Sequence, residues 1–259
     1  MQRLARSQEV KILLTESGKN ADLQGAHVID ASPSAGAAPT IAINYLVEDL
    51  KPVKIAEVRS LYFPHVSLVN GGIATRPKIE LYMYEGSNVK LLFIVRNFMI
   101  DSLEGGYVIA DKLHKFLIER GAYNYYLLTG LKITGERGTY VASVDPEGVR
   151  RFLESGARLI SGLENIPADK LSSYLLFFYS RKTGKAWLLI TEVVPYFPDP
   201  VAARDLIQVL SKALGFRVDL ERLDEEIEKQ KALLEEFQKD YEKMLQEGRK
   251  RGKEPFYIG

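Results

Sequence analysis

Hydrophobic residues recur along the chain with two different periods, and these alternate from the N-terminus to about residue 215. Short runs rich in Val, Ile, Leu and Tyr, bounded by polar, Gly or Pro residues, predict buried strands. Longer stretches in which apolar residues return every three or four positions predict amphipathic helices. The expected strands cover residues 9–16, 26–31, 53–58, 66–69, 79–84, 89–95, 124–129, 175–179 and 187–192. Strands that alternate with helices indicate an α/β layered fold with a largely buried mixed sheet.

Capping residues mark where several helices begin and end. Asp145-Pro146 and Asp199-Pro200 each place an N-cap acceptor before a proline at the first helical position, which predicts a helix start. Glycine just after an apolar helical stretch predicts a helix end. The expected helices extend to about Leu50, from about Tyr107 to Gly121, from Asp145 onward, and from Asp199 to Gly215.

Two hairpins are expected from turn residues between neighbouring strands. Gly86-Ser87-Asn88 separates the strands at 79–84 and 89–95 and predicts a tight turn. The segment 181–185, Arg-Lys-Thr-Gly-Lys, predicts a second hairpin between the strands at 175–179 and 187–192.

The region after Gly215 has a different pattern. Its apolar positions are spaced alternately by three and four, as along the a/d seam of a coiled coil, with one polar position. These positions are Leu220, Leu223, Ile227, Gln230, Leu234, Phe237, Tyr241 and Met244. Such a long, one-sided helix is expected to project from the body or to lie along another helix. The chain therefore divides into a core domain at 1–215, a helical segment at 216–248 and a flexible basic tail at 249–259.

Composition excludes several classes of function. The chain has 259 residues, of which 46% are hydrophobic, and its 35 Lys and Arg against 34 Asp and Glu give a net charge of +1. This balance argues against nucleic acid as the main partner, since phosphate binding requires a basic surplus. The absence of cysteine excludes disulfides, thiolate zinc sites and a cysteine nucleophile, and fits a cytoplasmic location. No apolar run approaches 18 residues, so no membrane span is expected.

Catalytic signatures are missing from the sequence. It contains no P-loop, G-x-G-x-x-G, H-E-x-x-H or G-x-S-x-G motif. Ser87-x-x-Lys90 and Lys182-Thr183-Gly184 match motifs of penicillin-binding enzymes. Serine acylation in those enzymes needs the serine at the start of a helix, so that the lysine one turn later can reach it. Here Ser87 lies in a predicted turn before a strand, and Lys182-Thr183-Gly184 lies in a predicted hairpin turn, so this chemistry is not expected. The three histidines, His27, His65 and His114, have no paired spacing and are each interpreted as a structural or surface residue. No catalytic residue, cofactor or metal site is therefore expected.

Two features have both a structural and a functional interpretation. The small-residue segment 34–40 lies between a strand and a helix, where it could bind an anion, but Pro39 removes one donor and a tight packing turn is favoured. Clustered tyrosines on strands indicate either a packed sheet or a subunit interface, and the sequence leaves both open. These tyrosines are Tyr82, Tyr84, Tyr123, Tyr125 and Tyr126.

The last four residues, Phe256-Tyr257-Ile258-Gly259, are the most distinctive feature. They follow a proline and a charged spacer, and an exposed aromatic pair lowers solubility unless it binds something. We therefore expect these residues to be a partner-binding anchor.

Several motifs together resemble the proteasome assembly chaperone family of the second-subunit type, especially its archaeal members. The motifs are the segment 36–50, Ile55-Ala-Glu-Val-Arg-Ser60, Phe63-Pro64, Tyr196-Phe-Pro-Asp-Pro200 and Ala202-Ala203. Their order and spacing extend the resemblance over residues 9–218. One departure is Ala37-Ala38-Pro39, where a second glycine is usual. The resemblance implies a three-layer α/β/α fold akin to nucleoside phosphorylases, without catalytic activity, in a homo-oligomer such as a tetramer or pentamer.

The resemblance also implies a partner. Archaeal members assist assembly of the proteasome core by binding its α-subunits, and some end in a hydrophobic–Tyr–any motif that docks between adjacent α-subunits. Phe256, Tyr257 and Ile258 match that motif. Gly259 follows them, so Tyr257 is not penultimate and the terminal carboxylate is displaced by one residue. The tail is accordingly interpreted as a variant anchor.

Two alternatives remain beside the assembly chaperone. One is a small-molecule enzyme on a nucleoside-phosphorylase-like or ATP-grasp-like scaffold. That reading requires a phosphate-cradling loop and clustered carboxylates for magnesium, and the sequence shows neither. The other is a scaffold whose projecting helices bind a different client.

Overall fold

The computed structural model describes residues 10–132, 136–160, 165–181 and 184–233. The chain forms two compact units, Met1–Asp219 and Leu220–Gly259. The first unit is the α/β body. In the second, residues 221–233 are helical, and the seam positions expected at 234, 237, 241 and 244 lie outside the described residues. Within the described ranges, no helix is long and apolar enough to cross a membrane.

A nine-stranded mixed sheet forms the centre of the body, in the order β1-β3-β6-β7-β2-β8-β11-β9-β10. Its strands are β1 (Val10–Leu14), β2 (His27–Ala31), β3 (Val53–Ser60), β6 (Ile79–Glu85), β7 (Lys90–Val95), β8 (Asn124–Leu131), β9 (Thr139–Ser143), β10 (Arg158–Leu159) and β11 (Lys185–Glu192). The central strands β7, β2, β8 and β11 are parallel. Antiparallel strands flank them on both sides. A separate hairpin is made by β4 (Leu68–Asn70) and β5 (Ile73–Thr75).

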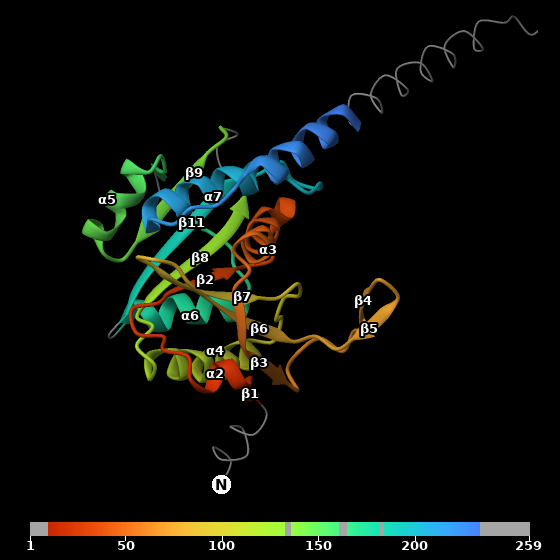
Figure 1. Cartoon of the computed structure of the whole chain (residues 1–259), viewed down its shortest axis with the longest axis vertical. Coiled ribbons are helices and arrows are strands. Elements are labelled where there is room, and N and C mark those ends of the chain that lie inside the picture. Colours follow the sequence, from red (N-terminus) through yellow and green to blue (C-terminus); the bar gives the residue numbers. More distant parts are fainter. Residues whose placement is uncertain (1–9, 133–135, 161–164, 182–183, 234–259) are drawn as a thin grey trace, which may run out of the picture. The chain divides into compact units, whose positions relative to one another are not determined.

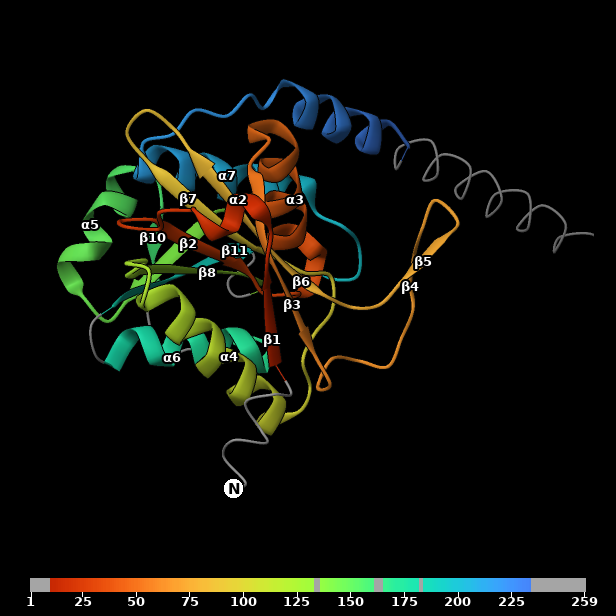
Figure 2. The same ribbon diagram turned by 60° about the horizontal axis from the view of Figure 1, so that its bottom comes forward.

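Helices cover both faces of the sheet (Figures 1 and 2). One layer contains α3 (Ala38–Leu50) and α7 (Pro200–Leu214), and the opposite layer contains α4 (Leu103–Ile118) and α6 (Lys170–Arg181). Two shorter helices, α2 (Glu16–Lys19) and α5 (Pro146–Glu154), lie beside β3 and β9 respectively. Because helices shield both faces, the central strands are nearly continuously apolar, and residues 125–130 of β8 are all buried. The expected α/β fold with a buried mixed sheet is confirmed.

Local signals set several of these boundaries as the sequence predicts. The side chain of Asp199 accepts a hydrogen bond from the Ala202 amide at the start of α7 (3.0 Å), and Gly215 ends that helix with φ +77°. The Gly86 amide donates to the Val89 carbonyl at 2.9 Å and closes the β6–β7 hairpin. Each of these contacts joins residues close in the chain, so the sequence pattern is sufficient to predict them.

The expected strand at 175–179 is wrong, because these residues lie in α6. Leu171, Leu175 and Tyr179 are completely buried and are four residues apart, so they form one face of a helix. The run Leu-Leu-Phe-Phe-Tyr is continuously apolar and contains Phe and Tyr, which are enriched in strands, so the helical period is obscured in the sequence. The second predicted hairpin therefore does not exist: β11 pairs in parallel with β8, and the chain enters it from a helix.

For two of the five clustered tyrosines, packing within the body decides between a packed sheet and a subunit interface. Tyr125 and Tyr126, adjacent on β8, point to opposite faces of the sheet. Tyr125 stacks on Tyr179 of α6 with ring centroids 5.0 Å apart, and Tyr126 stacks on Trp187 of β11 at 4.7 Å. Both are fully buried. These two tyrosines form part of the packed core and are not available to a subunit interface.

Candidate functional site: an exposed aromatic loop and a cationic pocket

A buried polar cluster lies near the carboxyl ends of the parallel strands, where open α/β sheets commonly bind ligands. Arg96, directly after β7, donates to both carboxylate oxygens of Asp169 at 2.9 and 2.7 Å. The same guanidinium lies 3.7 Å from the Asp30 carboxylate at the end of β2. All three side chains are completely buried. The cluster joins β2 and β7 to the start of α6.

Asp30 is held in this cluster by two hydroxyl groups as well as by the cation. It accepts hydrogen bonds of 2.6 Å from the hydroxyls of Tyr125 and Ser172. Burial raises the pKa of Asp30, and the neighbouring Arg96 guanidinium opposes that rise. Because these polar groups bond to one another inside the core, the arrangement stabilises the fold and presents no side chain to a substrate.

An exposed aromatic loop connects β11 to α7. Tyr196 is 94% exposed and Phe197 is 65% exposed, although both are large and apolar. Tyr196 also adopts φ +79°, a left-handed conformation that is unfavourable for a residue with a side chain. Strain and exposed aromatic surface together point to a binding role for this loop rather than a packing role.

The base of the aromatic loop is held firmly by Asp199. This residue is nearly buried, and its carboxylate accepts from the Val194 amide at 2.9 Å and lies 3.2 Å from the Arg137 guanidinium. Its amide donates to the Gly36 carbonyl at 2.8 Å. The loop therefore presents its two aromatics from a fixed base.

The small-residue segment 34–40 packs beneath the same loop. Gly36 has φ +66°, and a Cβ at this position would approach the Val193 Cβ to 2.8 Å, so no other residue fits without a shift. The Ser34 hydroxyl accepts from the Gly130 amide at 2.8 Å. Residues Ala35–Ala37 form a single 3₁₀ turn, η1, before α3. The packing interpretation of this segment is confirmed.

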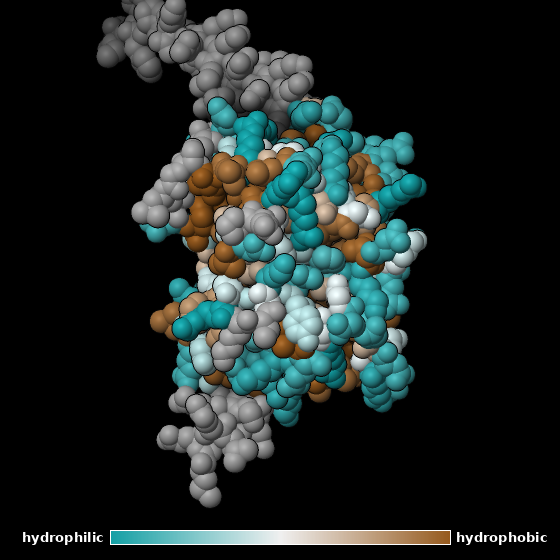
Figure 3. Space-filling model, turned by 90° about the vertical axis from the view of Figure 1, so that its left-hand side faces the viewer, coloured by the Kyte–Doolittle hydropathy of each residue, from teal (hydrophilic) through white to brown (hydrophobic). Residues whose placement is uncertain are grey.

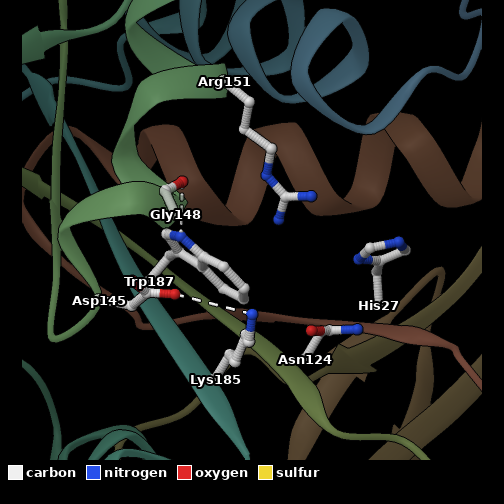
Figure 4. A pocket seen from close by; sticks show the side chains of 7 residues that line it. All are labelled: His27, Asn124, Asp145, Gly148, Arg151, Lys185 and Trp187. Atoms are coloured by element: carbon white, nitrogen blue, oxygen red, sulfur yellow. Dashed lines mark hydrogen bonds and ion pairs between the residues drawn. The ribbon is translucent and has the colours of Figure 1, made fainter.

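A pocket opens at the opposite, amino-terminal ends of the parallel strands, beside the first residues of β2, β8 and β11 (Figure 4). Its volume is about 260 Å³. Its walls are formed by His27, Asn124, Asp145, Gly148, Arg151, Lys185 and Trp187. His27, Asn124 and Lys185 begin β2, β8 and β11, and the remaining polar residues come from α5 and the turn before it.

Arg151 and His27 share one hydrogen-bond partner in this pocket. The Tyr126 hydroxyl accepts from the Arg151 guanidinium and lies 2.8 Å from His27 Nδ1. The guanidinium also lies over the Trp187 ring, 4.7 Å from its centroid. Burial and the positive charge of Arg151 lower the pKa of His27 to about 4, so its imidazole is neutral at physiological pH.

Other residues singled out in the sequence do not converge on a site. His65 is exposed in the loop after β3, and His114 of α4 packs against Tyr179 with ring centroids 4.9 Å apart. Ser87 lies in the β6–β7 turn, as expected, so the serine-acylation motif is not assembled. Within the described ranges, no cluster of His, Asp and Glu is arranged to hold a metal ion. Lys182, Thr183 and the whole tail, Phe256, Tyr257, Ile258 and Gly259, lie outside those ranges.

Sequence reasoning missed the pocket. The sequence indicates only a structural or surface role for His27, whereas this residue forms part of the pocket wall. The available signal was a polar residue at the first position of each of three buried strands, namely His27, Asn124 and Lys185. Recognising that signal requires knowing that the three strands are parallel neighbours, which hydrophobic periodicity does not show.

The fold defines an α/β protein with a mixed sheet between two helical layers. The chain belongs to the PAC2 family, whose family model matches residues 28–238, and the family resemblance seen in the sequence is thereby confirmed. It is similar to the crystal structure of Pyrococcus furiosus PbaB, described as an archaeal proteasome activator: the TM-score is 0.78 and the identity 21%, over 89% of this chain and 99% of that one. Pyrococcus furiosus PbaA, described as an archaeal homolog of proteasome-assembly chaperone, matches with TM-score 0.74 and 24% identity over 94% of this chain and 97% of that one. Protein MJ1210 of Methanocaldococcus jannaschii, named as uncharacterized, is 24% identical over 240 residues, which are 91% of this chain and 92% of that protein.

Proposed function

We propose that this chain is a non-catalytic chaperone for assembly of the proteasome core, and that it binds proteasome α-subunits through its C-terminal tail. Membership of the PAC2 family is the observation that carries this proposal. The likeness to PbaB and PbaA over about nine-tenths of the chain supports a proteasome-related partner. The proposed location is cytoplasmic, in the compartment where such a partner would assemble.

The tail supplies the proposed contact through Phe256 and Tyr257. An aromatic pair buries a large apolar area, and the tyrosine hydroxyl adds one directional hydrogen bond. Pro255 stiffens the approach, which limits the entropy lost on docking. Gly259 displaces the terminal carboxylate by one residue, so a single tail is expected to bind weakly.

A homo-oligomer would compensate for weak individual tails. Several tails on one assembly raise the effective concentration at a ring of α-subunits and give avidity without new contacts. We infer that the subunits associate through the α/β body, which is akin to nucleoside phosphorylases. The helix that includes residues 221–233 is proposed to continue as a coiled-coil-like segment that leads to the tail.

The described surfaces favour binding over catalysis. The exposed Tyr196 and Phe197 suit contact with a protein, since aromatic residues are enriched at interfaces. The acids at the carboxyl edge of the sheet, Asp30 and Asp169, are completely buried and cannot reach a substrate. These observations favour the chaperone over an enzyme on the same scaffold.

Capture of purified proteasome α-subunits by the immobilised full-length chain tests the proposal. We expect the parent chain to capture them, and Tyr257→Ala and a chain lacking residues 256–259 to lose capture. Lys253→Ala, in the spacer before the anchor, is the matched control and should capture normally. Light scattering should show an assembly for the parent and for all variants. If Tyr257→Ala captures as well as the parent, the tail is not the anchor; if the parent captures nothing, the chaperone proposal fails.

A further inference from the structure

In the pocket at the amino-terminal ends of the parallel strands, the positive charge of Arg151 has no negatively charged partner among the described residues. Among the described residues, no carboxylate lies within ion-pairing distance of its guanidinium, which instead bonds to the Tyr126 hydroxyl and lies over the Trp187 and Phe152 rings. Its Nε atom is buried without a hydrogen-bond partner in the described structure. The adjacent Arg150, by contrast, is exposed and pairs with Glu154 at 2.9 Å. A half-buried cation without a counterion is costly, and a bound anion would remove that cost.

The remaining polar groups of the pocket converge on the same space. Figure 4 shows Arg151 reaching in from α5, and Lys185, Asn124 and His27 reaching in from the starts of their strands. In the described structure, the Asn124 side-chain amide has no hydrogen-bond partner, so it is available to a ligand. Donors that approach from different elements suit an acceptor placed between them.

His27 contributes an uncharged imidazole to the pocket. Arg151 can only donate, so the Tyr126 oxygen accepts from it, and the phenolic hydrogen can then be donated to His27 Nδ1, which lies 2.8 Å away. A neutral imidazole that accepts at Nδ1 must carry its hydrogen on Nε2. In that tautomer His27 adds an uncharged N–H donor to the two cations of the pocket, Arg151 and Lys185.

We propose that this pocket binds a small monocarboxylate, with the guanidinium of Arg151 as its main ligand-binding group. The planar guanidinium matches the two oxygens of a carboxylate in a two-bond geometry. The inference goes beyond the chaperone function, which requires no small molecule. It assigns the pocket a ligand class that neither the tail nor the aromatic loop would bind.

Charge balance and size favour a small monoanion. Lys185 lies 3.7 Å from the Asp145 carboxylate, so these two charges offset each other and Arg151 supplies a net charge of about +1. The Asp145 carboxylate would repel the second charge of a phosphate dianion. The volume of about 260 Å³ is below the roughly 300–1,000 Å³ typical of sites for drug-sized ligands, so the ligand is small.

Trp187 provides a direct measurement because it is the one tryptophan in the sequence. Fluorescence of the full-length chain should change saturably on titration with benzoate or acetate, and much less with inorganic phosphate at equal ionic strength. Arg151→Gln, which can still donate to Tyr126, should weaken carboxylate binding at least tenfold. Arg150→Gln removes the same charge one residue away, outside the pocket, and should bind as the parent does.

A second variant and a second observable guard against a folding artefact. Asn124→Asp places a negative charge in the pocket and should abolish carboxylate binding, while Asn124→Gln should retain part of it. Independently, a bound carboxylate should raise the pKa of His27, which can be followed by NMR of its ring protons.

Three outcomes would contradict the proposal. Absence of a saturable response in the parent, or equal binding by Arg151→Gln and Arg150→Gln, would overturn the site. Stronger binding of phosphate than of either carboxylate would overturn the ligand class. Capture of α-subunits by Arg151→Gln should equal that of the parent, so the two proposals can fail separately.

Discussion

The guanidinium of Arg96 donates to both carboxylate oxygens of Asp169, at 2.9 and 2.7 Å, and thereby joins the end of β7 to the start of α6. The two residues are 73 positions apart in the sequence, and both side chains are completely buried. Asp30 shares the same cation. The pair lies near the carboxyl ends of the parallel strands, where enzymes with open α/β sheets commonly bind their substrates. Here the buried ion pair fills that place and stabilises the fold.

Arg96→Met should destabilise the body strongly. The substitution leaves Asp30 and Asp169 buried without a cation, and breaking a buried pair in this way costs about 3–5 kcal/mol of unfolding free energy. Urea denaturation followed by circular dichroism measures the change. Arg150→Met, which breaks the exposed pair with Glu154, is the control and should change the unfolding free energy by no more than about 0.5 kcal/mol. Equal effects of the two substitutions would contradict the structural role of the cluster.

Tyr196→Gly should leave the free energy of unfolding unchanged or raise it by up to about 1 kcal/mol, because glycine adopts positive φ without strain. The side chain is 94% exposed, so its removal costs almost no packing. Tyr196→Val should be destabilising, because a β-branched residue fits this conformation poorly. Thermal denaturation compares the two. A lower melting temperature for Tyr196→Gly than for Tyr196→Val would show that the tyrosine stabilises the loop.

Asp199→Ala should lower the free energy of unfolding by about 2 kcal/mol, because it removes the cap of α7 and leaves the Val194 amide without its acceptor. Asp199→Asn keeps one side-chain acceptor and should lose less. Urea denaturation measures both changes. The interpretation is wrong if Asn and Ala at this position are equally destabilising.

Acid should destabilise the body through His27. The pKa of His27 is lowered to about 4 in the folded chain from its usual 6.5, so the unfolded chain binds the proton more strongly. The free energy of unfolding should therefore decrease as the pH falls from about 6.5 to about 4. Arg151→Gln removes one cause of the lowered pKa, and NMR titration should show the His27 value moving back toward 6.5. The charged neighbours Asp145 and Lys185 remain in this variant and line the same pocket. A His27 pKa unchanged by Arg151→Gln would contradict the assigned contact.

The sequence by itself determined the elements whose signals lie within a few residues. The N-cap of α7, its glycine end and the β6–β7 turn each depend on contacts between near neighbours in the chain, so their residues specify them directly. The order and spacing of the short motifs also identified the family. These features need no knowledge of which strand lies beside which.

Only the tertiary structure decided how distant segments combine. α6 is a helix because Leu171, Leu175 and Tyr179 pack together on the sheet, although the apolar run 175–179 that it contains resembles a buried strand. β9, which the sequence did not predict, pairs with β11. Residues from three strands and from α5 form the Arg151 pocket because β2, β8 and β11 are parallel neighbours. Parallel pairing joins strands that are far apart in the chain, so the local hydrophobic period does not show which strands pair. The strand order is decided by which apolar faces are buried together when the whole body folds.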